Sequence, residues 1–137
     1  MLDDKIIVFI PIKIVSEANN TNHWSVKRRR STALQWAIIH ALKNMFVFSL
    51  PCTITFERIG KRFLDYDNLV HAFKSARDIV AKIVIDSIEL QLDRPIGQYD
   101  SDPRLTFIYS QKSFLNGFEE KRPLGFTITI EKNHEIN

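Results

Sequence analysis

Residues 53–84 read TITFERIGKRFLDYDNLVHAFKSARDIVAKIV, and the two patterns in this stretch decide the fold. Ile54 and Phe56 alternate with polar neighbours, which is the period of a strand, and Gly60 ends that strand. From residue 68 to about 84, apolar side chains recur every three or four positions, as on the buried face of a helix. The stretch therefore predicts a strand at residues 51–59 followed by an amphipathic helix.

A further strand is expected at residues 5–15, which are rich in isoleucine and valine. Their nearly continuous apolar run indicates burial on both faces, whereas Pro11 argues for an edge or a bulge. A helix should follow, capped by Ser25 or Ser31 and running to about Asn44.

Two more strands, Leu105–Tyr109 and Phe126–Ile130, are expected to be joined through Asn116-Gly117, and residues 86–98 form a connecting excursion. The predicted fold class is α/β (α+β), with a small mixed sheet of about four strands and two main helices in the order β-α-β-α-β-β. The whole chain, residues 1–137, is expected to be one domain.

Composition agrees with one globular domain, since 45% of the 137 residues are hydrophobic and 26% are charged. The single cysteine, Cys52, cannot form an intramolecular disulfide and is expected to be buried in a protein of the reducing cytoplasm. The apolar stretch Ile6–Ile12 is far shorter than the ~20 residues that span a bilayer. Acidic Asp3 and Asp4 do not resemble the basic start of a secretory signal.

The formal net charge is only +3, but the basic residues are clustered. The clusters are Lys27, Arg28, Arg29 and Arg30; Lys61 and Arg62; and Lys121 and Arg122. Clusters of this kind suit contacts with DNA phosphates. The first one lies near the start of a predicted helix, where it opposes the helix dipole and would favour a nearby anion.

The segment Asp65-Tyr66-Asp67-Asn68 places two carboxylates two residues apart, just before the second predicted helix. In an extended backbone alternate side chains point the same way, so both carboxylates could bind one Mg²⁺ or Mn²⁺ ion. The alternative is that Asp67 or Asn68 simply caps the helix.

On that helix Asp67, His71, Lys74 and Asp78 would fall on one narrow stripe. A charged stripe is usually a solvated face. Because this one begins at a candidate metal ligand, Lys74 could instead reach a phosphate and stabilise charge in a transition state.

A second acidic pair, Asp100 and Asp102, precedes the strand at residue 105 and could supply further metal ligands. Its alternative role is ordinary turn chemistry with Pro103. The four histidines have no cysteine partners at zinc-ligand spacing, so a zinc site is not expected.

Together, Asn22-His23-Trp24, LDYDNLVHAFKSARD (residues 64–78) and DSDPRL (residues 100–105) resemble the RusA-like Holliday junction resolvases, the crossover junction endodeoxyribonucleases of bacteria and their phages and prophages. The resemblance covers about residues 5–131. It implies a homodimeric mixed α/β fold that binds magnesium and cleaves branched DNA in recombination and repair. It also implies a lysine needed for cleavage.

Carried over residue by residue, Asp65 and Asp67 match the family's paired metal ligands, and Asn68 matches the asparagine that follows them. Asp100 matches the third acid, with Asp102 as the rival for that role. Lys74 is preferred to His71 for the lysine, because Lys74 keeps a four-residue step to Asp78.

The leading hypothesis is therefore a magnesium-dependent endonuclease specific for four-way junctions or related branched DNA. One alternative is a nucleic-acid-binding module of the same fold that does not cleave. Another takes Asp65 as the nucleophile of a haloacid-dehalogenase-type phosphatase.

Overall fold

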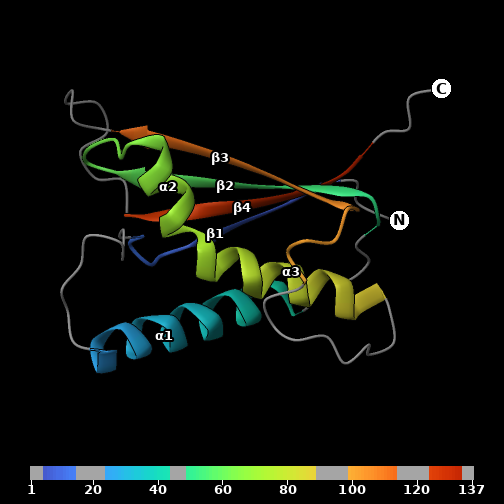
Figure 1. Cartoon of the computed structure of the whole chain (residues 1–137), viewed down its shortest axis with the longest axis horizontal. Coiled ribbons are helices and arrows are strands. Elements are labelled where there is room, and N and C mark those ends of the chain that lie inside the picture. The colour runs from blue at the N-terminus through green and yellow to red at the C-terminus, as the bar shows by residue number, and fades with distance from the viewer. Residues whose placement is uncertain (1–4, 15–23, 44–48, 89–98, 114–123, 134–137) are drawn as a thin grey trace.

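The computed structural model describes residues 5–14, 24–43, 49–88, 99–113 and 124–133 of the chain. They form an α+β fold, a four-stranded mixed sheet with three helices on one side of it (Figure 1). The element order is β-α-β-α-α-β-β. The predicted class and strand number are confirmed, but two helices stand where one was expected.

The sheet has the strand order β1-β4-β2-β3. Its strands are β1 (Lys5–Ile10), β2 (Cys52–Gly60), β3 (Leu105–Ser113) and β4 (Gly125–Lys132). The β2 and β3 strands pair in parallel, whereas β4 is antiparallel to both β1 and β2. Although β3 and β4 are consecutive in the sequence, they do not pair, because β4 lies between β1 and β2. Asn116-Gly117 lies outside the described residues.

Helix α1 spans Trp24–Leu42, so Ser25 and Ser31 are both inside it and the predicted caps are wrong. The predicted helix at 68–84 is instead α2 (Tyr66–Ala72) and α3 (Lys74–Ile88). They separate at Phe73, whose backbone N–H is shared between the carbonyls of Leu69 at 3.3 Å and Val70 at 3.2 Å. Hydrophobic spacing continues through this bend and could not reveal it. Among the described residues, no helix is long and apolar enough to cross a membrane.

The core lies between the sheet and the helices, where Ile54, Phe56 and Phe73 are fully buried. The opposite face of the sheet is open, since Ile7 and Phe9 on β1 are 59% and 38% exposed. The expected burial of the first strand on both faces is therefore wrong. Its predicted position at an edge is confirmed, and β1 ends immediately before Pro11.

Cys52 is buried as predicted, with 1% of its surface exposed. Burial raises the pKa of its thiol from 9.0 to about 11, because the charged thiolate would lose its hydration. The thiol is accordingly protonated and unreactive at neutral pH.

Phe73 fills the space where α2 meets α3 and packs against Phe56, with ring centroids 5.1 Å apart. Replacing Phe73 with alanine should therefore reduce the free energy of unfolding by about 3–5 kcal/mol, which denaturant titration would measure. Phe63→Ala is the control, because Phe63 is 66% exposed and its loss should cost less than about 0.5 kcal/mol. Equal effects of the two changes would contradict this description of the core.

Candidate metal and nucleic-acid site

Asp65 and Asp67 are both exposed at the beginning of α2. Asp65 is the N-cap residue, with φ −58° and ψ 150°, and among the described residues its side chain makes no capping hydrogen bond. Asp67 and Asn68 are inside the helix, so neither is its cap. The extended geometry that would have aligned the two carboxylates therefore ends at Asp65. Both acids nevertheless face solvent within one helical turn.

The loop that carries Asp65 is held by the side-chain amide of Gln111 on β3. The backbone N–H of Leu64 donates to Oε1 of Gln111 at 2.9 Å, and Nε2 of Gln111 donates to the carbonyl of Leu64 at 2.7 Å. Below the loop, the buried Arg58 donates from Nη1 to the carbonyl of Arg62 at 2.8 Å. These bonds attach the first acidic motif to the sheet.

The predicted stripe is divided by the bend at Phe73. Asp67 and His71 belong to α2, whereas Lys74 and Asp78 belong to α3. His71 and Lys74 are exposed and Asp78 is partly buried. Both candidates for the cleavage-promoting cation therefore remain accessible to a ligand.

Asp102 is an integral part of the turn that enters β3. Its carboxylate accepts hydrogen bonds from the backbone N–H of Arg104 at 3.0 Å, from its Nε at 2.9 Å and from its Nη2 at 2.8 Å. Only 3% of the Asp102 side chain is exposed. The turn role considered from the sequence is thus present here, and binding a metal would require Asp102 to give up these bonds.

Asp100 belongs to a group of charged and polar side chains that sequence periodicity did not reveal. Its Oδ2 lies 2.9 Å from Nε of Arg77 on α3, and Nη1 of Arg77 donates to the hydroxyl of Tyr109 at 3.1 Å. Asp78 lies beside Asp100. Burial raises the pKa of Asp78 and the adjacent Asp100 carboxylate raises it further, while Arg77 and Lys74 oppose the shift.

The two acidic motifs lie at opposite ends of the parallel strand pair. Leu105, just after Asp102, pairs with Cys52 at the start of β2, whereas Gln111, which holds Leu64, pairs with Arg58 near its end. The six residue steps from Leu105 to Gln111 span roughly 20 Å at about 3.3 Å per step. Figure 1 shows α2 at one end of β2 and β3 and the segment that enters β3 at the other. Within one chain, the four aspartates cannot surround one ion.

A magnesium ion would thus have an incomplete set of protein ligands in a single copy. In the part of the chain that the structure describes, no three acidic, histidine or cysteine side chains are close enough together to hold a metal. Asp65 and Asp67 still offer two exposed carboxylates. Mg²⁺ commonly takes one or two carboxylates and completes its shell with water and substrate phosphate, so this pair fits the ion if other ligands come from outside the chain.

The basic residues lie at the same end of the molecule as Asp65 and Asp67. Lys61 and Arg62 are exposed in the loop before α2. The run of Lys27, Arg28, Arg29 and Arg30 is on the N-terminal half of α1, at the left of Figure 1 together with α2. Asn22 and His23 lie outside the described residues, as do Lys121 and Arg122. An acidic pair is thus placed on a predominantly basic end of the protein.

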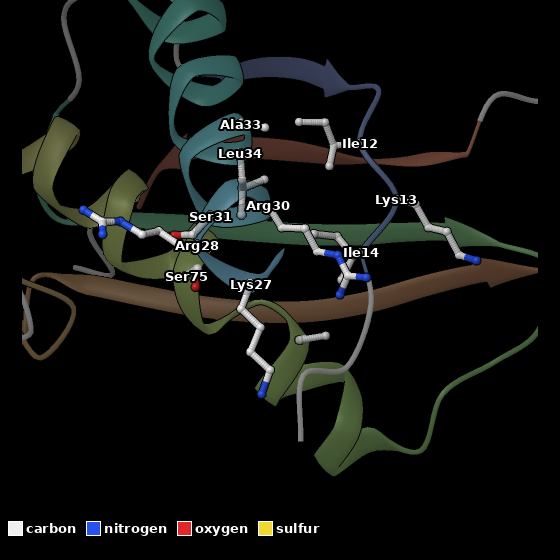
Figure 2. Close-up of a pocket in the computed structure, with 11 residues that line it drawn as sticks. Ile12, Lys13, Ile14, Lys27, Arg28, Arg30, Ser31, Ala33, Leu34 and Ser75 are labelled. Carbon is white, nitrogen blue, oxygen red and sulfur yellow. The ribbon is translucent and has the colours of Figure 1, made fainter. Parts of the chain in front are cut away.

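A pocket opens beside this basic run, with a volume of about 510 Å³. Figure 2 shows basic side chains from α1 and from the segment after β1 spread around aliphatic residues. The pocket is lined by Ile12, Lys13, Ile14, Lys27, Arg28, Arg30, Ser31, Ala33, Leu34, Ala72 and Ser75.

No protein-family model, curated protein or solved structure matches this chain. The resemblance to the RusA-like resolvases therefore rests on the three quoted motifs.

Asp78 is expected to make the protein less stable as the pH rises. Its folded-state pKa is raised, so the folded state holds the proton more tightly than the unfolded state. Stability should be highest below the ordinary pKa of 3.8 and fall as the pH passes through the raised value. Asp78→Asn should then raise the melting temperature at pH 7 by roughly 1–3 °C, a modest value because water still reaches this group.

Thermal melts between pH 3.5 and 7, recorded with a chelator present, would measure this difference. The gap between the variant and the wild type should close at the acidic end of the range. Asp86→Asn, on the same helix but paired with Lys82, is the control and should lower the melting temperature slightly or leave it unchanged. A destabilised Asp78→Asn protein at pH 7 would show that the carboxylate is favourable there.

Proposed function

We propose that this protein is a magnesium-dependent, structure-specific endodeoxyribonuclease of the RusA-like type that cleaves Holliday junctions or related branched DNA. The observation that carries the proposal is the exposed Asp65 and Asp67 pair, anchored to the sheet and set on a basic end of the molecule. An anionic polymer is attracted to such a surface. The carboxylates of Asp65 and Asp67 would repel phosphate unless a cation is bound between the carboxylates and the phosphate.

In this proposal Asp65 and Asp67 hold Mg²⁺ beside the phosphate to be cleaved. When bound, the ion supplies Lewis-acid stabilisation and lowers the pKa of a water molecule. Lys74, or His71 in its place, lies one to two turns further along and offsets charge on the phosphate. The basic residues of α1, with Lys61 and Arg62, hold the DNA backbone through contacts that carry little sequence information.

The separation of the acidic motifs bears directly on the proposed homodimer. Because Asp100 is about one strand length from Asp65 in the same chain, a third acid at the metal would have to come from a second copy. A two-fold dimer places equivalent surfaces against each other and would form two such sites. Four-way junctions have approximate two-fold symmetry, so two sites suit paired nicking.

A binding module without cleavage is the second candidate, and the arginine contacts of the second acidic motif favour it. Asp102 is bound by Arg104 and Asp100 by Arg77, so both carboxylates are stabilised without any metal. Such a module would bind branched DNA equally well with and without magnesium and would leave it intact.

Cleavage of a synthetic four-way junction across a magnesium titration tests the proposal. The wild type should nick the junction only with magnesium present. Asp67→Asn should reduce nicking by roughly 100-fold or more while binding stays the same or tightens slightly, because a repulsive charge is removed near phosphate.

Glu131→Gln is the matched control for that variant. It removes an acid of β4 whose side chain is 46% exposed, and nicking should remain at the wild-type rate. Binding by the wild type that is indifferent to magnesium, without any nicking, would support the binding module and overturn the nuclease proposal.

Mixing two inactive variants tests whether the acids act across a dimer. Asp67→Asn and Asp100→Asn should each be inactive alone, whereas subunit exchange would rebuild one intact site in each mixed dimer. The mixture should therefore nick one strand of the junction without cutting the opposite strand. Circular dichroism would confirm that Asp100→Asn is folded despite losing its contact with Arg77. Failure of the folded variants to restore nicking would exclude a shared site.

A further inference from the structure

We infer that the pocket between α1, the segment after β1 and the α2–α3 junction binds a nucleotide unit drawn out of a DNA strand. The inference rests on the proposed function, since it specifies how this protein would hold its DNA. Its basis is that the pocket combines an aliphatic interior with a cationic rim. A phosphate site would need only the cations, and an apolar groove would need only the aliphatic residues.

The interior of the pocket is aliphatic. Ile12, Ala33 and Ala72 supply its accessible apolar surface, whereas Ile14 and Leu34, 4% and 7% exposed, lie behind them in the core and add little. A volume of about 510 Å³ falls within the range of roughly 300–1,000 Å³ typical of small-molecule sites. A planar, weakly polar group such as a nucleobase would bury its faces against these walls, and Ser31 and Ser75 offer hydroxyl groups to its edges.

Among the residues that the structure describes, the ionisable side chains lining the pocket share one sign of charge. They are Lys13, Lys27, Arg28 and Arg30, all basic. Figure 2 shows these side chains spread around the aliphatic residues and not converging on one point. Charges arranged in this way match successive phosphates of a strand better than one compact anion, because each phosphate can meet a different cation. Charge and apolarity together specify a nucleotide with its neighbouring phosphates.

The position of the pocket is consistent with a strand that also reaches Asp65 and Asp67. Ala72, which lines the pocket, is the last residue of the helix that carries Asp67 in its first turn. Ala72 is five residue steps after Asp67, about 7.5 Å along the helix axis, and the two side chains lie on different faces. Drawing a base out of a strand costs least where its pairing or stacking is already interrupted, so the branch point is the position at which we expect it.

A four-way junction carrying 2-aminopurine at the branch point tests the inference, with the full-length protein and a chelator in place of magnesium. Emission of 2-aminopurine rises when the base leaves the stack, and wild-type protein should increase it about threefold or more. Ala33→Phe should abolish the increase by filling the pocket, while the junction affinity stays within about threefold, because the phosphate contacts remain. Thr32→Phe, at an exposed neighbouring position outside this pocket, should behave as the wild type.

A second pair of variants separates the pocket from the general basic surface. Arg30 lines the pocket and Arg29 does not. Arg30→Gln should weaken binding of a short 2-aminopurine oligonucleotide about tenfold, whereas Arg29→Gln should weaken it much less. Inorganic phosphate, thymidine and thymidine monophosphate are the competitors, and only the monophosphate should displace the oligonucleotide at millimolar concentration.

An increase in emission that persists in Ala33→Phe would overturn the inference. So would tight binding of thymidine monophosphate without any emission change on junctions, which would identify a site for free nucleotides. A drop in the melting temperature of Ala33→Phe, together with no emission change in the wild type, would show that the chain itself covers these walls. All these measurements are made without cleavage, so they can fail or succeed independently of the nuclease proposal.

Discussion

Parallel pairing of β2 with β3 is the constraint on which the rest of the arrangement depends. Parallel neighbours cannot be joined by a tight turn, so the chain must return along the sheet before β3 begins. The α2 and α3 helices make that return and cover one face of the sheet, with Phe73 at their junction packed on Phe56. One result is a buried core on one side and an open face on the other. A second result is that the segment just after β2 and the segment just before β3 lie at opposite ends of this strand pair.

That second result determines what each acidic motif can do. Asp65 and Asp67 follow β2 and are exposed beside basic residues. Among the described interactions, no arginine contacts either carboxylate. Asp100 and Asp102 precede β3 and lie against α3 and in the turn, where the partly buried carboxylate of Asp100 and the buried one of Asp102 need compensation. Arg77 and Arg104 provide it. The two motifs look alike in the sequence, yet Asp65 and Asp67 are exposed, whereas Asp100 and Asp102 contact arginines that a metal ion would have to displace.

The basic end of the molecule combines two kinds of surface. Exposed cations on α1 and before α2 would attract an anionic polymer over a long range, and the pocket among them would add the short-range, shape-dependent contact that we infer. Long-range attraction alone would not distinguish branched from linear DNA, because both carry the same phosphate charge. A site that accepts an unstacked nucleotide would distinguish them if a base is drawn out more easily at the branch point than within a duplex.

The sequence by itself determined most strands and helices and the acidic and basic character of their surfaces. Alternation located β2, helical spacing located α1 and most of α2 and α3, and the spacing of Asp65 and Asp67 marked the exposed acidic pair, because these features depend on neighbours along the chain. The sequence did not determine the strand order, the bend at Phe73, the open face beneath Ile7 and Phe9, or the pairing of Asp100 with Arg77. Each of these depends on contacts between residues far apart in the chain. The pattern of apolar and charged residues along a segment does not show which distant residue will contact it. Only the tertiary structure decided that the two acidic motifs lie apart, because the direction of β3 relative to β2 is set by packing of the whole sheet.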